Sequence, residues 1–261
     1  MARSLSTLRR SLARRLDPQP PAPEAGAVDL RTEIVRRYLT GLGVLRTELA
    51  RRYIRGAGIE FGALDFPLAV PPGTAVQDAD FQPAESVKQL FSVPGNVQSP
   101  HLVTDLESMH GVLSASQDFV IANHVLEHVE DPLKALHSVS RVLRTGGIAY
   151  LALPDKRFTF DKEREVTSLA HLLRDHAEGP DWSLAGHYEE WIRVVDGLTG
   201  EAHAQKLEVM LKERSNIHFH VWDFAAMMEL FAHVERDRSF ALDVENATLN
   251  SVEVVWILRK R

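Results

Sequence analysis

The stretch from residue 118 to residue 154 constrains the fold most, because it reads as a strand, a helix and a second strand in direct succession. The apolar run DFVIAN precedes DPLKALHSVSRVLRTGG, in which Asp131 is placed to cap a helix, Pro132 to open it and Gly146 to end it. The run IAYLALP completes the unit. Both apolar runs are continuous rather than alternating, which is typical of strands buried on two faces. The sequence therefore predicts an α/β fold whose parallel sheet carries helices on both faces.

Similar patterns extend this unit towards the N-terminus. Apolar positions at helical spacing predict a helix over residues 29–54. Short apolar runs predict strands at residues 58–61, 74–79 and 101–104, and a further helix is expected at residues 83–91. We interpret the region after residue 57 as one folded domain that continues to the C-terminus, residues 58–261, preceded by the helix of residues 29–57.

Charge is distributed unevenly along the chain. Residues 1–16 hold five arginines and no acid, so a formal net charge of -6 for the whole chain leaves -11 for the rest. Leucines at helical spacing accompany the arginines, and a proline-rich linker follows them. Residues 1–28 are therefore interpreted as a basic tail and linker. A fraying tail, a surface anchor for an anionic membrane or acidic partner, and a transit peptide remain alternatives.

Composition excludes several classes of protein. The chain has no cysteine, which rules out disulfides, a thiolate nucleophile, thiolate-bound zinc and an iron–sulfur cluster. Its mild acidity argues against a nucleic-acid partner. No apolar run is long enough to span a bilayer, and we expect a cytoplasmic protein.

Polar residues follow each predicted strand at the edge where parallel sheets bind ligands. Glu60 and Gly62 end the first strand, and Asp80 follows the second, twenty positions after Glu60. A carboxylate at that offset from a glycine turn commonly accepts both hydroxyl hydrogens of a nucleotide ribose. Asp105 follows the third strand and Asn123 ends the fourth. The alternative is that Asp80 and Asp105 only cap helices and form turns.

The segments GIEFGALDFPL, AVQDAD, VTDLE and DFVIANHVLEHVEDP…RVLRTGG, in this order, resemble the class I S-adenosylmethionine-dependent methyltransferases. The LEH…RVLRTGG pattern is similar to the type 11 branch, and the similarity is best over residues 59–161. The resemblance implies a Rossmann-like sheet of seven strands, mostly parallel, with an antiparallel last strand. Residues 240–250 and 251–261 would form its antiparallel end. Leu64 stands where the family's second glycine is expected.

The resemblance also implies S-adenosylmethionine as cofactor. By this resemblance, Asp80 would hold the ribose hydroxyls of the cofactor and Asp105 would accept a hydrogen bond from its adenine amino group. The cofactor offers an ammonium, a diol and an amine, all of them donors, which suits a cluster of carboxylates and carbonyls. The expected cofactor-binding residues are Glu60, Gly62, Ala63, Leu64, Asp80, Asp105, Leu106, Asn123 and His124.

Methyl transfer from a sulfonium is an in-line displacement, for which the protein mainly supplies alignment and a dry site. A hydroxyl acceptor also needs a base, and His124 after the fourth strand is the first candidate. His128 lies one helical turn later and either shares that face or packs locally. Asp155 is the third candidate catalytic residue, with Lys156 and Arg157 at the rim of the pocket.

Residues 162–235 do not fit the minimal fold and are expected to form a helical insertion that covers the pocket. His187, Tyr188 and Trp191 lie at helical spacing there and, with Lys156 and Arg157, are the expected acceptor-binding residues.

The segment HFHVW places His218 and His220 on one strand face, which invites a metal site. No carboxylate stands at the usual spacing for a third ligand, so we predict no metal site. Asp223 is expected to cap a helix instead.

The predicted function is methyl transfer from S-adenosylmethionine, with O-methylation of a small-molecule or glycan hydroxyl in a bacterial protein. The alternative is a catalytically silent module that keeps the fold and binds cofactor, for which Leu64 in the glycine turn is the argument. A nicotinamide-dependent enzyme is a third hypothesis, but the three-glycine cradle for a pyrophosphate is missing.

Overall fold

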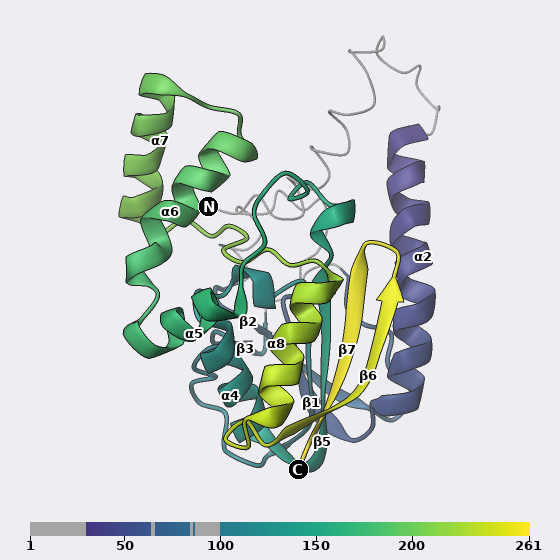
Figure 1. Cartoon of the computed structure of the whole chain (residues 1–261). Coiled ribbons are helices and arrows are strands. Elements are labelled where there is room, and N and C mark those ends of the chain that lie inside the picture. The colour runs from purple at the N-terminus through teal and green to yellow at the C-terminus, as the bar shows by residue number, and fades with distance from the viewer. Residues whose placement is uncertain (1–29, 64–65, 84–85, 87–99) are drawn as a thin grey trace.

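A computed structural model describes residues 30–63, 66–83, 86 and 100–261 of the chain. Within them, seven strands form one sheet in the order β3-β2-β1-β4-β5-β7-β6 (Figure 1). The first five strands pair in parallel, whereas β7 runs antiparallel between β5 and β6. This order confirms the expected Rossmann-like fold class. The strands are β1 (Ala57–Phe61), β2 (Ala75–Asp80), β3 (Leu102–Val103), β4 (Gln117–Asn123), β5 (Leu143–Pro154), β6 (Leu242–Asn250) and β7 (Glu253–Lys260).

Helices cover both faces of the sheet, and the central strand β4 shows why. Its side chains alternate: Phe119 and Ile121 join the apolar cluster under α2, and Val120 and Ala122 join the cluster under α4 and α8. All four are fully buried, as expected for a continuous apolar strand. The helices are α2 (Leu30–Tyr53), α4 (Pro132–Val142), α5 (Leu169–Glu178), α6 (Asp181–Val194), α7 (Gly200–Glu213) and α8 (Phe224–Arg236), with short 3₁₀ turns at Leu126–His128 and Lys156–Phe158.

The start of α4 follows the prediction and its end does not. Asp131 caps the helix by accepting a hydrogen bond from the Lys134 amide at 2.9 Å, and Pro132 is its first residue. The helix ends at Val142, so the prediction that Gly146 ends it was wrong. Leu143 is already extended and pairs with Gln117 of β4. Gly146, at a positive φ, lies inside β5.

Helices α5, α6 and α7 form a lobe to one side of the sheet (Figure 1). The lobe has its own apolar cluster, which includes Tyr188, Trp191 and Met210. By contrast α8, which lies inside the range expected for the insertion, packs Met227 and Phe231 into the cluster of the sheet. Residues 214–223, called the extended segment below, connect the lobe to α8 outside any helix or regular strand, and Asp223 caps α8 as expected.

Some predicted elements lie outside the described residues: the basic tail and linker (residues 1–28) and almost all of the helix expected at residues 83–91. In the part of the chain that the structure describes, no helix has the length and apolar character needed to cross a membrane.

Candidate functional site

A cavity of about 810 Å³ opens at the carboxyl ends of the parallel strands. Its lining takes Glu60 from β1, Asp80 from β2, Asp105 after β3, and Asn123 and His124 from the end of β4. The topology thus brings together five residues that are spread over 64 positions of the sequence. Gly62, Ala63, Leu106 and His128 line the same cavity, and Leu64 lies outside the described residues.

Glu60 is a buried acid with one oxygen left for a ligand. Its Oε1 accepts a hydrogen bond from the Leu68 amide at 2.9 Å, while Oε2 finds no partner among the described residues. Burial raises the pKa of Glu60 to about 7, against the lowering effect of the Leu68 bond. A donor or a positive charge in the cavity would stabilise the ionised form.

Asp80 repeats this arrangement one strand away. Its side chain is buried, and Oδ1 has no hydrogen-bond partner in the described part of the chain. Burial raises the pKa of Asp80 to about 6, although the backbone of Gln82 and Phe81 donates to it. Two neighbouring strand ends therefore each present an unsatisfied carboxylate oxygen.

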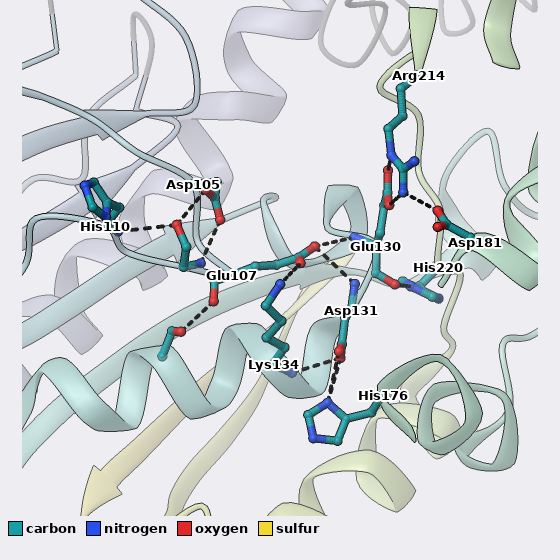
Figure 2. A network of polar contacts seen from close by, with 12 residues as sticks. Asp105, Glu107, His110, Glu130, Asp131, Lys134, His176, Asp181, Arg214 and His220 are labelled. Atoms are coloured by element: carbon teal, nitrogen blue, oxygen red, sulfur yellow. Dashed lines mark hydrogen bonds and ion pairs between the residues drawn. The ribbon is translucent and has the colours of Figure 1, made fainter. Parts of the chain in front are cut away.

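Asp105 is different, because it is exposed and its carboxylate is already engaged. Oδ1 accepts from the Ser108 amide and Oδ2 from the Ser108 hydroxyl, both at 2.7 Å (Figure 2). The turn-forming role that was left open at this position is therefore real. Asp105 still lines the cavity, beside the buried Leu106.

Only glycine fits well at position 62. It has φ +65°, a conformation that favours glycine, and a Cβ at this position would lie 2.9 Å from Cγ2 of Val125. Any side chain here would press on Val125, which also lines the cavity. The glycine keeps the loop after β1 close to the loop after β4.

His124 stands at the cavity wall and is held by a carboxylate from the far end of the chain. The residue has φ +56°, and its Nε2 donates to Oε2 of Glu253 at 2.6 Å. Glu253 also accepts from Nε of Arg46 at 2.8 Å and from Asn250 at 2.7 Å. Burial alone would raise the pKa of Glu253, but the bonds from His124 and Arg46 lower it to about 2. Glu253 is thus a fixed anion that orients the His124 ring.

A second set of titratable groups lies close to Nδ1 of His124. Glu127 is fully buried, neither of its oxygens has a hydrogen-bond partner among the described residues, and burial raises its pKa to about 7. Its Oε1 lies 3.6 Å from Nδ1 of His124 and 4.0 Å from Nε2 of His218. His218 in turn donates from Nδ1 to Asp161 at 2.7 Å.

His128 packs locally rather than facing the cavity with a free nitrogen. Its Nδ1 donates to the carbonyl of Ile217 at 2.9 Å, and its ring meets that of His218 edge-on. Burial and the neighbouring His218 lower the pKa of His128 to about 3, so it stays neutral. Of the two alternatives stated for His128, the structure favours packing.

Asp155, Lys156 and Arg157 are not part of the described cavity lining, contrary to the prediction. Asp155 is buried and accepts hydrogen bonds from both Nε and Nη2 of Arg157, the shortest at 2.9 Å and 2.6 Å. Lys156 donates to the backbone carbonyl of Arg164. Because Arg157 folds back onto the residue two positions before it, this polar loop closes on itself.

His187, Tyr188 and Trp191, predicted to bind the acceptor, also lie outside the described lining of this cavity. Tyr188 is buried and donates to the carbonyl of Ser215 at 2.9 Å, and Trp191 packs inside the lobe under Arg164. Their helical spacing marks the inner face of α6.

The lobe does reach the cavity, but through its extended segment. Four residues of that segment line the cavity: Arg214, Asn216, His218 and Phe219. Their spacing follows no helical or strand period, so the sequence pattern did not mark them.

Comparison with known proteins gives one family match. Residues 73–151 match the model of a methyltransferase domain. No curated protein matches the chain.

Several solved structures are similar at low identity. One is an S-adenosylmethionine-dependent methyltransferase from Thermotoga maritima, described as a possible histamine N-methyltransferase, with 15% identity, 99% of this chain and 100% of that chain covered, and a TM-score of 0.47. A second is described as a putative zinc-dependent alcohol dehydrogenase from Rhodobacter sphaeroides, with 15% identity, 80% and 86% covered, and a TM-score of 0.48. A third is an S-adenosylmethionine-dependent methyltransferase from Methanosarcina mazei, with 13% identity, 80% and 95% covered, and a TM-score of 0.43.

Similarity at this level carries no argument about activity or substrate. The family match lies on β2 to β5, the strands that build most of the cavity edge. The match to a methyltransferase domain covers residues 73–151, and the strand order is that of the Rossmann-like fold expected from the sequence.

Proposed function

We propose that the chain is an active methyltransferase that uses S-adenosylmethionine to methylate a hydroxyl group of a small molecule or a glycan. One observation carries the proposal: the strand ends present buried acceptor atoms with no partner in the described chain, Glu60 Oε2, Asp80 Oδ1 and Asn123 Oδ1, in one cavity. Buried polar atoms are normally satisfied, so unsatisfied ones that line a cavity point to a ligand that donates.

The donor pattern of the cofactor fits these atoms. Glu60 suits the ammonium of the methionine part, because a buried carboxylate gains most from a positive partner. Asp80 suits the two ribose hydroxyls, and the outer carboxylate lone pairs of Asp105 suit the adenine amino group, with Leu106 beside the ring. Gly62 leaves the loop after β1 open for the methionine part. When bound, S-adenosylmethionine supplies a methyl group activated by its sulfonium.

His124 is proposed as the base that removes the proton of the acceptor hydroxyl. Its Nε2–H is committed to Glu253, which leaves Nδ1 as the nitrogen that accepts a proton. Glu253 then faces an imidazolium at 2.6 Å and compensates its charge, in the manner of a carboxylate–histidine pair. Glu127, 3.6 Å from Nδ1, lies beside the transferred proton and can hold it, since its raised pKa keeps the protonated form accessible near neutral pH.

The far wall of the cavity supports a polyhydroxyl acceptor. It combines Asn216, Glu130 and Lys134 with the aromatic ring of Phe219. Amide, carboxylate and ammonium groups pair with hydroxyls, and an aromatic face packs against the apolar side of a sugar ring.

The test is transfer of a labelled methyl group from S-adenosylmethionine to a panel of sugars, nucleotide sugars, glycans and phenols. The proposal expects a labelled ether product from at least one hydroxyl acceptor, and its loss in His124→Ala. Binding of the cofactor without transfer to any hydroxyl would contradict the proposal and favour a silent binding module. Transfer to nitrogen or carbon alone would overturn the assignment to hydroxyl acceptors.

A further inference from the structure

Four potential metal ligands converge in the helical lobe, outside the described cavity lining. They are His171 and Asp175, one turn apart on α5, His187 on α6, and His220 on the extended segment before α8. One ligand atom from each lies within 4.8 Å of all the others. The four residues come from three segments of the chain, so the cluster forms only when the lobe is folded.

The separations within this cluster suit a shared ion. Nε2 of His171 lies 3.2 Å from Nε2 of His187 and 3.1 Å from Oδ2 of Asp175. Tetrahedral zinc with bonds near 2.0–2.1 Å sets its ligand atoms about 3.3 Å apart. Two of the six edges of such a tetrahedron thus already have about this length.

Hydrogen bonds within the protein do not satisfy the cluster. His220 is buried, and its Nδ1 has no hydrogen-bond partner in the part of the chain that the structure describes. The contact between His171 and His187 brings two imidazole nitrogens together, and one proton at most can lie between them. An ion at the centre would use all four atoms.

Outer contacts hold the ligands in the required orientation and tautomer. His220 donates from Nε2 to the carbonyl of Glu130 at 3.1 Å (Figure 2), which leaves Nδ1 unprotonated and able to bind an ion. Ser183 donates to Oδ1 of Asp175 at 2.9 Å and leaves Oδ2 for an ion. Such supporting bonds to histidine and carboxylate ligands are typical of metal sites.

The ligands also have the protonation states that a metal needs. Burial, with the neighbouring His171, lowers the pKa of His187 to about 4, and burial lowers that of His220 to about 3. Both rings are therefore neutral at physiological pH. Burial raises the pKa of Asp175, but bonds from His171 and Ser183 outweigh it and the net shift is downward, so this carboxylate is ionised.

We propose that His171, Asp175, His187 and His220 bind one divalent transition-metal ion, Zn²⁺ above all, in a closed structural site. Three imidazole nitrogens and one carboxylate oxygen are a typical zinc donor set, and four protein ligands leave no open position for substrate. The ion would join α5, α6 and the extended segment. Since this segment carries Asn216, His218 and Phe219 to the cavity, the metal would fix the wall on which the acceptor is expected.

The site does not depend on the proposed function, and metal content tests it directly. The full chain is produced without a polyhistidine tag, stripped with a chelator, dialysed and loaded with Zn²⁺. We expect about one zinc ion per chain by mass spectrometry, and visible absorption bands of tetrahedral cobalt when Co²⁺ replaces it. His171→Gln and Asp175→Asn are expected to weaken zinc binding at least ten-fold in competition with a chromophoric chelator.

Two control variants make the result specific. His203→Gln removes a histidine of the neighbouring helix α7 that is not in the cluster, and His218→Gln removes one from the second group of potential ligands, Glu127, His128 and His218. Both controls should keep the metal. Zinc lost in His218→Gln and retained in His171→Gln would overturn the proposal.

A variant that misfolds does not prevent a conclusion, because the wild-type protein alone can contradict the proposal. Wild-type protein that takes up no zinc and gives no tetrahedral cobalt bands contradicts the site by itself, whatever the variants do. A wild-type chain that binds zinc no more tightly than a well-folded His171→Gln chain, judged by circular dichroism, contradicts it equally.

Discussion

The cavity edge and the ion pairs around Arg164, which precede α5, treat their buried charged residues in opposite ways. At the cavity, Glu60 and Asp80 are buried with an oxygen that nothing in the described chain satisfies. Just before α5, the fully buried guanidinium of Arg164 bonds to Asp161 at 2.9 Å and to Glu190 of α6 at 3.0 Å. Unsatisfied buried groups are costly to the fold and useful to a ligand, whereas satisfied ones hold structure. The comparison separates the residues that should control binding from those that should control stability.

The largest expected effect on stability is at Arg164. Arg164→Ala leaves Asp161 and Glu190 without their common cation, and we expect a loss of about 3–5 kcal/mol in the free energy of unfolding. Urea denaturation measures it. The matched control is Arg51→Ala, which breaks an exposed ion pair with Glu48 on α2 and should cost about 0.5 kcal/mol or less. Equal losses in both variants would contradict the assigned role of Arg164.

The largest expected effect on turnover is at His124. His124→Ala removes the proposed base, and kcat should fall about 100-fold or more, while the dissociation constant of the cofactor changes little. Steady-state kinetics and calorimetry separate the two. The Arg46→Lys variant keeps the charge beside Glu253 and should retain most of the activity. Unchanged kcat in His124→Ala would exclude this residue as the base.

A smaller effect is expected from adding a side chain at Gly62 in the loop after β1. Gly62→Ala and Gly73→Ala both place a side chain at positive φ, which costs about 1–2 kcal/mol in stability. Only at Gly62 would the new Cβ meet Val125, since no atom lies within 4 Å of such a Cβ at Gly73. Cofactor binding should therefore weaken in Gly62→Ala and not in Gly73→Ala. Equal affinities in the two variants would show that the close approach to Val125 has no bearing on the ligand.

The smallest effect is a pH dependence. Burial raises the pKa of Glu60 to about 7 and of Asp80 to about 6, and both acids are proposed to bind donors in their ionised form. Cofactor affinity should therefore fall as pH drops from 7.5 towards 5.5, by up to about ten-fold per pH unit for each proton taken up. Calorimetry across this range measures the slope, which should shrink in Glu60→Gln. An affinity independent of pH would contradict the ionic role of these acids.

The same comparison explains what the sequence could predict. The residue after a parallel strand lies at the binding edge wherever the strand goes, so Glu60, Asp80 and Asn123 could be placed from local pattern alone. The helix caps Asp131 and Asp223 could also be predicted from the sequence, because a helix cap is a contact between residues three positions apart.

The remaining site residues depend on contacts between distant segments. Glu253 meets His124 across 129 positions and Arg46 across 207, and no local pattern marks either contact. Gly146 and Asp155 were misplaced because strand pairing and a loop that closes on itself override local signals. The prediction of no metal site was based only on the spacing of residues within and near HFHVW. In the folded chain, His218 contacts Asp161, and His220 joins a cluster with residues of α5 and α6.

Calorimetric titration of S-adenosylmethionine into wild-type and Asp80→Asn protein tests the central claim most directly. Asparagine keeps the size of the side chain and removes the carboxylate that the cavity leaves unsatisfied. The account predicts one binding site per wild-type chain, at least ten-fold weaker binding in Asp80→Asn, and the same thermal unfolding temperature or a higher one. No binding to folded wild-type protein at millimolar cofactor, or equal affinity in both proteins, would contradict it.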